Sequence, residues 1–351
     1  MVEKSAEKNG NYHQKICCFG EALFRFSPFL QGEFIESAIM PVYLGGAELN
    51  VASALANFGA EAKYFTALPD NYLSKEIIQQ IKNRNIDASS IKFCGERIGI
   101  YYLPQGADLK SNGVIYDRSH SSFSTLKPGN VDWETVLEDV NWFHFSAISP
   151  ALSEQSAALC LEGLQEATKR NITISIDLNY RAKLWQYGKK PSEIMNPLLA
   201  YCHVIMGNIW SAAALLDIPL RDHYNYTGQD KQFFLREANV SAAEILNKFS
   251  TCHTVANTFR FDEGEGINYY ASLNNCDGQV ASSTYTAKNI IDRVGSGDCF
   301  MAGLIYGLRL GYSPQNIVEF ATAAGFSKFQ QIGDVTTSDI KNIEQLIKNN
   351  E

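Results

Sequence analysis

Short apolar runs of β type alternate with longer helical patterns along most of this 351-residue chain. Parallel strands need connections of about a dozen or more residues, usually helices, so the alternation predicts βα units and a mostly parallel sheet. We expect strands at residues 16–19, 64–67, 142–145, 172–176, 204–206 and 254–256. We expect helices at residues 47–58, 74–84, 153–170, 209–216 and 242–249. The predicted fold class is therefore α/β.

Two segments break this pattern. Residues 21–44 and 95–121 are rich in aromatic and β-branched side chains without a helical period, which predicts strands outside the main sheet. They could form two surface hairpins, or one small β-lid over a site with its tyrosines facing a ligand. Residues 218–241 are polar and irregular, and we expect a surface insertion there. No repeat, charge block or Gly/Ser linker divides the chain, so we expect one domain over residues 1–351.

Charge and composition narrow the class of protein. The chain has 30 Lys and Arg against 38 Asp and Glu, a formal charge of −8, which disfavours nucleic acid and anionic membranes as partners. Residues 1–13 are polar and lack an apolar signal core, and no uninterrupted apolar stretch is long enough to span a membrane. We therefore expect a frayed tail and a cytoplasmic protein. The eight cysteines include no C-x-x-C pair and the six histidines no i, i+4 pair, which predicts reduced thiols and no histidine metal site.

The most informative motif is the sequence DRVGSGDCF at residues 292–300, which leads into an amphipathic helical pattern. Two glycines before a helix, Gly295 and Gly297, permit a tight turn whose backbone N–H groups and positive helix end suit an anion. Such a site can stabilise the charge on a transferring phosphoryl group. Asp298, in the first helical turn, is placed to accept a proton from a substrate hydroxyl. The alternative is that Asp298 caps the helix and the glycines form only a turn.

A second glycine motif, YLGGAELN at residues 43–50, also runs from a β-type segment into a helix. Its small side chains suit tight helix packing, which is the structural interpretation. The functional interpretation is that Gly46 allows a substrate to approach closely and that Asn50 hydrogen-bonds sugar hydroxyls. The chain contains neither G-x-G-x-x-G nor G-x-x-x-x-G-K-[ST], which argues against a Rossmann dehydrogenase and a P-loop kinase.

Together these motifs resemble the paired signatures of the ribokinase (PfkB) family of carbohydrate kinases, over roughly residues 16–335. The resemblance implies a three-layer α/β/α sandwich with a small β-sheet lid. It also implies transfer of a phosphoryl group from ATP, with Mg²⁺, to a sugar hydroxyl. Asp298 would be the base, and Gly295, Ser296 and Gly297 would form the anion hole that holds the transferred group.

Three further segments are similar to the 2-keto-3-deoxygluconate kinases of that family. The segments GIYY at 99–102 and VIYDR at 114–118 match lid strands, and DLNYRAKLW at 177–185 matches D-x-N-x-R-x-x-L-W. By this resemblance, the substrate-binding residues are Gly46, Asn50, Tyr101, Tyr116, Arg118 and Arg181. A sugar acid carries a carboxylate, which a planar guanidinium binds well, although each arginine could instead form a surface ion pair. The implied reaction converts 2-keto-3-deoxygluconate into its 6-phosphate.

The chain departs from the family pattern at three places. Ser211 stands where the family often has the glutamate of N-x-x-E, which begins here at Asn208, so the magnesium ligands stay open. The nucleotide loop, expected at residues 258–266, is longer and more acidic than T-x-G-x-x-G. Arg293 replaces a usual threonine. The residues expected to contact the nucleotide are Asn208, Thr258, Arg260, Gly295 and Gly297.

Two other functions stay open at this point. One is a neutral-sugar kinase such as a fructokinase or ribokinase, against which Arg118 and Arg181 argue. The other is a non-catalytic sugar- or nucleotide-binding regulator, against which the intact segment 295–298 argues. The gluconate and galactonate epimers fit the sequence equally well. Because the lids of this family commonly pair between subunits, we expect a homodimer or higher homo-oligomer whose small-molecule partners are the sugar acid and ATP.

Overall fold

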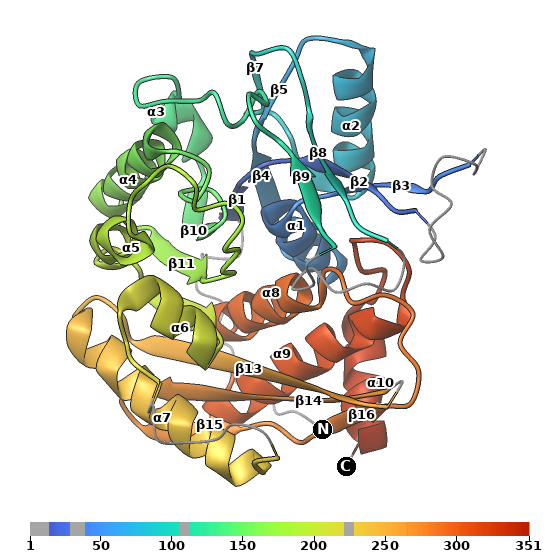
Figure 1. Ribbon diagram of the computed structural model, residues 1–351, viewed down its shortest axis with the longest axis vertical. Helices are drawn as coiled ribbons and strands as arrows, with labels where there is room; N and C mark the ends of the chain where they lie inside the picture. The colour runs from blue at the N-terminus through green and yellow to red at the C-terminus, as the bar shows by residue number, and fades with distance from the viewer. Residues whose placement is uncertain (1–13, 29–38, 105–112, 221–227, 265, 351) are drawn as a thin grey trace.

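The computed structural model describes residues 14–28, 39–104, 113–220, 228–264 and 266–350, and a large sheet forms its middle layer (Figure 1). The strands follow across the sheet in the order β15 (Gly278–Ala281), β14 (Gly266–Asn275), β13 (Thr254–Glu263), β12 (Val204–Gly207), β11 (Thr173–Asp177), β10 (Val140–Ser146), β1 (Lys15–Phe19), β4 (Ala62–Phe65) and β6 (Ile86–Asp87). Every neighbouring pair from β13 to β6 is parallel. β14 runs antiparallel to β13, to β15 and to β16 (Tyr285–Ala287). The prediction of a mostly parallel α/β sheet is confirmed.

Helices cover both faces of this sheet and complete a three-layer α/β/α sandwich (Figure 1). Successive strand residues face opposite sides, so Trp142 packs in one core and Phe143 in the other. The first core includes side chains from α1 (Ala47–Asn57), α2 (Tyr72–Asn83), α8 (Ser296–Arg309), α9 (Pro314–Ser327) and α10 (Ile340–Asn350). The second includes side chains from α3 (Trp133–Val136), α4 (Glu154–Lys169), α5 (Pro191–Leu199), α6 (Ile209–Leu216) and α7 (Lys231–Lys248).

A separate four-stranded sheet contains strands from both of the segments that interrupt the βα pattern. Its order is β3 (Val42–Gly45), β2 (Leu23–Phe26), β8 (Gly99–Tyr102) and β9 (Ile115–Asp117). β2 and β8 pair in parallel, which joins the two segments at the centre of the sheet. The alternative of two separate surface hairpins is therefore wrong, and the prediction of one small β-sheet is confirmed. We call this sheet the lid.

Two expectations about local structure are wrong. Residues 218–241 are not irregular throughout, because α7 begins at Lys231 and includes the helix expected only at residues 242–249. Residues 258–263 are not a loop, because β13 continues through them and pairs with β14 as a hairpin. The tail at residues 1–13 lies outside the described residues. A short third sheet, β5 (Ala67–Leu68) with β7 (Lys92–Phe93), was not expected either.

The predictions about thiols and membrane spans can also be compared with the structure. All eight cysteines are free thiols, and six of them are buried. No helix in the described part of the chain is long and apolar enough to cross a bilayer.

A buried arginine fastens the lid to the turn that precedes α8. Arg25, on β2, is 1% exposed, and its Nη2 lies 2.6 Å from Oδ2 of Asp292. Its Nε lies 2.7 Å from Oδ1 of Asp334, in the segment that follows α9. The same Asp292 accepts hydrogen bonds from the backbone N–H groups of Val294 and Gly333, each at 3.1 Å. One side chain thus joins the lid, the glycine turn and the segment after α9.

We predict that Arg25→Met strongly destabilises the protein, because it leaves two buried carboxylates without their cation. Breaking a buried ion pair on one side costs about 3–5 kcal/mol, and the free energy of unfolding, measured by urea denaturation, should fall by that amount. Arg170→Met is the matched control, since Arg170 pairs with Glu166 on the surface of α4 and should have little effect. Equal stability of the two variants would contradict the role given to Arg25.

Candidate active site

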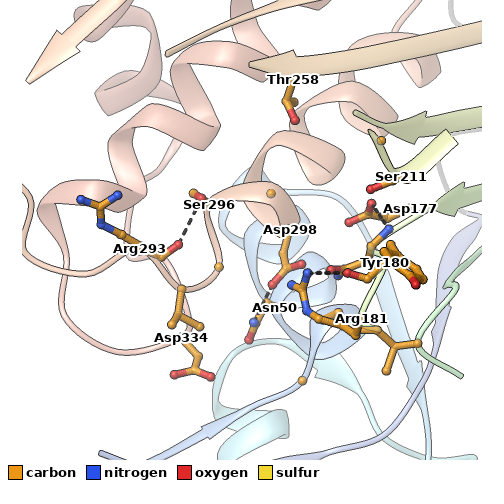
Figure 2. A pocket seen from close by; sticks show the side chains of 18 of the residues that line it. Asn50, Asp177, Tyr180, Arg181, Ser211, Thr258, Arg293, Ser296, Asp298 and Asp334 are labelled. Carbon is orange, nitrogen blue, oxygen red and sulfur yellow. Dashed lines mark hydrogen bonds between the residues drawn. The ribbon is translucent and has the colours of Figure 1, made fainter. Parts of the chain in front are cut away.

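The carboxyl ends of the central parallel strands and the start of α8 surround one cavity (Figure 2). Parallel strands end at the same edge of a sheet, which explains why residues far apart in sequence meet there. Each site residue predicted from the sequence lines this cavity, namely Gly46, Asn50, Tyr101, Tyr116, Arg118, Arg181, Asn208, Thr258, Arg260, Gly295, Ser296, Gly297 and Asp298. The lid contributes the tyrosines, and β13 contributes Thr258 and Arg260.

Glycine is needed at the two positions of the turn before α8 for different reasons. Gly295 is the N-cap of α8 with φ +84°, and a Cβ there would lie 2.1 Å from the carbonyl oxygen of Asp334. Only glycine fits that position. A Cβ on Gly297 would meet no atom within 4 Å, and Gly297 lines the cavity. The tight turn therefore needs Gly295, whereas Gly297 keeps open the space in front of the helix N-terminus, where an anion is favoured.

Asp298 is a buried carboxyl that accepts a hydrogen bond from the side chain of Asn50. It is 8% exposed, and the Nδ2 atom of Asn50 donates to its Oδ2 at 2.7 Å (Figure 2). Burial raises the pKa of Asp298 to about 8, against the opposing effect of the Asn50 hydrogen bond, while Asp177 and Glu48 raise it further. The N-cap of α8 is Gly295, and Asp298 lies in the first turn of the helix, so Asp298 is not the N-cap residue.

Two more buried carboxyls belong to the same region. Asp177, at the end of β11, lines the cavity and accepts a hydrogen bond from the backbone N–H of Asn179 at 3.0 Å. Burial raises the pKa of Asp177 to about 6. Glu48, on α1, accepts a hydrogen bond from the backbone N–H of Ser146 at 2.9 Å, and burial raises its pKa to about 7. The site therefore holds several carboxyls that are easy to protonate near neutral pH.

The two predicted arginines have different surroundings. Arg118 is 6% exposed and forms an ion pair with Glu21, so its guanidinium already has a carboxylate partner within the protein. Arg181 extends into the cavity, where its Nη1 donates to the carbonyl oxygen of Tyr180 at 3.2 Å (Figure 2). Its positive charge lowers the pKa of both Asp177 and Asp298. Arg181 is thus the better placed of the two for an incoming carboxylate.

The lid tyrosines and Gly46 form the lid side of the cavity. The hydroxyl of Tyr101 donates a hydrogen bond to Oδ2 of Asp334 at 2.7 Å. The ring centroids of Tyr101 and Tyr116 lie 6.4 Å apart. Gly46 has φ +134°, and a Cβ there would lie 2.2 Å from the carbonyl oxygen of Glu21. Glycine is therefore required by the backbone at this position, whatever it also allows a substrate to do.

On the opposite side, helix α6 and strand β13 line the cavity. Asn208 is the N-cap of α6, and its Oδ1 accepts a hydrogen bond from the backbone N–H of Ser211 at 2.8 Å. Thr258 and Arg260 are two residues apart on β13, so both side chains face the same side of the sheet. Arg293, which replaces the usual threonine, forms an ion pair with Asp262 at the edge of the cavity.

Sequence reasoning missed several residues of this site. Asp177 and Tyr180 stood inside the motif DLNYRAKLW, but only Arg181 was assigned a role. The apolar-to-polar change at the end of β11 could have indicated Asp177, since ligands bind at that sheet edge. Trp210, Tyr269 and Asp334 also line the cavity, and no local pattern marks them.

Comparison with known proteins agrees with this geometry. Residues 13–341 match the profile of the pfkB family carbohydrate kinases. The crystal structure of 2-dehydro-3-deoxygluconokinase from Thermotoga maritima superimposes with a TM-score of 0.86 and 33% sequence identity, over 96% of this chain and 100% of that one. The 2-dehydro-3-deoxygalactonokinase of Haloferax volcanii is 27% identical over 338 residues, which are 95% of this chain and 96% of the relative.

A third relative, the 2-dehydro-3-deoxygluconokinase of Bacillus subtilis, is 24% identical over 323 residues, which are 90% of each chain. The profile match extends over most of the chain and includes both glycine motifs, the lid strands and the cavity between them. This chain therefore belongs to the PfkB family of carbohydrate kinases.

Proposed function

We propose that this protein transfers the terminal phosphoryl group of ATP to the 6-hydroxyl of a sugar acid, 2-keto-3-deoxygluconate. The observation that carries the proposal is the position of Asp298, beside the open space at Gly297 and in one cavity with Arg181. A base, an anion site and a carboxylate-binding cation are thus within reach of one small molecule. The names of the similar proteins, which are kinases of keto-deoxy sugar acids, support the same substrate class.

In this proposal the sugar acid lies between the lid and α8. Arg181 binds its carboxylate, because a guanidinium offers two parallel donors to that group. Arg118 supports the lid through Glu21 and has a smaller part in binding. The hydroxyl groups of the sugar meet Asn50 and Tyr116, and Gly46 lets the chain of the sugar pass close to the backbone. Tyr101, which donates to Asp334, shapes the wall on the lid side.

Asp298 accepts the proton of the attacking hydroxyl, and the N-terminus of α8 receives the transferred group. The backbone N–H groups of Gly295, Ser296 and Gly297 then face the charge that develops on the phosphoryl oxygens. Phosphoryl transfer is catalysed mainly by positioning and by such electrostatic stabilisation. The nucleotide lies on the side of Asn208, Thr258 and Arg260.

Magnesium would neutralise phosphate charge when it is bound with ATP. In the described part of the chain, no group of three or more His, Cys, Asp or Glu side chains could hold a metal. Mg²⁺ bound to a nucleotide needs only one or two carboxylates in addition to phosphate oxygens and water. Asp177 fits that smaller requirement, and Ser211 lines the same cavity (Figure 2). These two residues are the candidates for contact with the magnesium ion or its waters.

Steady-state turnover over a panel of substrates tests the proposed function. The panel contains 2-keto-3-deoxygluconate, its galactonate epimer, gluconate, fructose and ribose, each with ATP and Mg²⁺. We expect kcat/KM for the keto-deoxy acids to exceed that for either neutral sugar by about 10-fold or more, because only the acids engage Arg181. A higher value for fructose or ribose would indicate a neutral-sugar kinase. Sugar binding without turnover of any member would indicate a regulator.

The outer face of the lid is the surface that we propose for a homodimer. Val42 and Ile115 are 50% and 62% exposed, and an apolar groove runs between the lid and α2 beside Phe24, Leu44 and Ile100. An exposed apolar patch of this kind marks an interaction surface, and a second copy of the same lid would cover it by twofold symmetry.

The free thiols of the protein also support a location in the reducing cytoplasm.

We predict that Val42→Glu shifts the protein from dimer to monomer, since it places a charge in the lining of that apolar groove. Light scattering coupled to gel filtration measures the change in mass at micromolar concentration. Lys92→Glu, on β7 away from the groove, is a control that should leave the mass unchanged. A wild-type protein that is already monomeric would contradict the dimer.

We predict that Asp298→Asn lowers kcat by about 10²–10⁴, the usual contribution of general-base catalysis. The substitution keeps the size of the side chain and an oxygen that can accept from Asn50, so the fold should be retained. Calorimetry should still detect binding of the sugar acid. Asp277→Asn, on the exposed turn between β14 and β15, is the matched control with normal kcat. Near-normal kcat in Asp298→Asn would reassign Asp298 to a structural role.

We predict that Arg181→Met lowers kcat/KM for the keto-deoxy acid by roughly 10- to 150-fold, because a hydrogen bond to a charged group is lost. The methionine keeps most of the packing of the arginine stem. Slow turnover of fructose by the same variant serves as the internal control, since a neutral sugar has no carboxylate to lose. Equal losses for the acid and the neutral sugar would mean that Arg181 supports the pocket in general.

A further inference from the structure

Tyr269, on β14, has a feature that the proposed mechanism does not explain. Its side chain is buried, at 3% exposure, and within the described part of the chain its hydroxyl has no hydrogen-bond partner. Its ring packs in the first core against Phe329, with the ring centroids 5.4 Å apart. Buried hydroxyl groups nearly always have a partner, because they lose their hydrogen bonds to water. A buried hydroxyl without a partner therefore suggests that a bound ligand accepts its hydrogen bond.

The hydroxyl of Tyr269 faces the start of α8. Tyr269 lines the cavity together with Gly297 and Asp298. A Cβ on Gly325, in α9, would lie 2.7 Å from the tyrosine hydroxyl oxygen and 3.0 Å from the carbonyl oxygen of Ser296. Gly325 thus leaves room where the hydroxyl and the first turn of α8 come together. The hydroxyl therefore lies beside the first turn of α8, on a residue that lines the cavity.

The surroundings of this hydroxyl favour a negatively charged acceptor. Burial raises the pKa of Tyr269 far above its usual range, so the group keeps its proton and can donate. Arg260 is its cross-strand partner on β13, and its positive charge acts on the hydroxyl in the opposite direction. Directly paired residues of two antiparallel strands face the same side of the sheet. A neutral donor, a guanidinium and a helix N-terminus therefore face one space.

We infer that the hydroxyl of Tyr269 donates a hydrogen bond to the phosphate chain of the bound nucleotide. Of the two anionic substrates, the nucleotide is the one on this side of the cavity, because Tyr269 and Arg260 belong to the β13–β14 hairpin whereas the sugar acid lies under the lid. The inference rests on the proposed function only in taking a nucleotide as the phosphoryl donor. It makes Tyr269 a binding residue and gives the buried hydroxyl its missing partner.

The chain provides a matched control on the same strand. Tyr270 is the next residue, is also 3% exposed, and also has a hydroxyl without a hydrogen-bond partner in the described part of the chain. It faces the other side of the sheet, where its ring packs 5.1 Å from that of Phe259 and 5.0 Å from the ammonium of Lys231. It does not line the cavity. Tyr269→Phe and Tyr270→Phe thus remove the same atom on opposite faces.

Calorimetric titration with ADP in the absence of sugar tests the inference. We expect Tyr269→Phe to weaken ADP binding roughly 10- to 100-fold, and Tyr270→Phe to leave it within about twofold. Adenosine, which has no phosphate, should bind both variants and the wild type alike. Both variants should unfold at or above the wild-type temperature, because neither loses a hydrogen bond within the protein. Stability and affinity are thus expected to change in opposite directions at Tyr269.

Several results would overturn the inference. Unchanged ADP affinity in Tyr269→Phe would mean that the hydroxyl does not contact the nucleotide, and equal weakening in both variants would mean a general effect on β14. A parallel loss of adenosine affinity would assign the contact to the nucleoside. Absence of ADP binding to the wild type would overturn both this inference and the proposed function. If ADP binds as expected but no sugar acid is phosphorylated, only the proposed function fails.

Discussion

Arg25 is the side chain on which the geometry of the site depends, because it joins the lid to the glycine turn across 267 positions of sequence. It pairs with Asp292 at the start of the turn and with Asp334 after α9, and each ion pair is almost fully buried. Lys328, whose ammonium is buried nearby, raises the local positive charge to match the two carboxylates. The turn, the lid strand β2 and the wall formed by Asp334 are therefore held in one arrangement before any substrate arrives.

That arrangement buries Asp298 and thereby sets its chemistry. A carboxyl removed from water holds its proton more tightly, and the neighbouring Asp177 and Glu48 strengthen the effect on Asp298. In the proposed mechanism the site receives two anions, and a carboxyl that is neutral in the empty enzyme would reduce repulsion during their binding. The same burial makes its ionised form a stronger base once the substrate hydroxyl is in place. In the proposed mechanism, the burial of Asp298 thus serves both binding and catalysis.

Periodicity, the glycine motifs and the family resemblance predicted the layers, the lid and many of the cavity residues, because these motifs are local and parallel strands bring their ends together. They did not indicate Asp177, Trp210 or Asp334. They also did not indicate which charges pair. Arg25 lies in an ordinary β pattern, and its carboxylates are distant in sequence, as Glu21 is from Arg118. The family resemblance predicted a nucleotide loop at residues 258–266, but β13 continues through Glu263 because it pairs with β14. These ion pairs and strand pairings join residues that come together only in the folded chain, so no local pattern in the sequence could predict them.

The central claim is that a buried Asp298 acts as the base, and the pH dependence of kcat/KM for the sugar acid tests it most directly. With the pKa of Asp298 raised to about 8, the active ionised form is the minority at neutral pH. The carboxylate of the substrate stays ionised throughout this range. At saturating ATP and magnesium, kcat/KM should therefore rise by nearly tenfold per pH unit below the pKa and level off above about pH 8. A profile that stays flat between about pH 6 and 9, or falls as the pH rises, would contradict the claim.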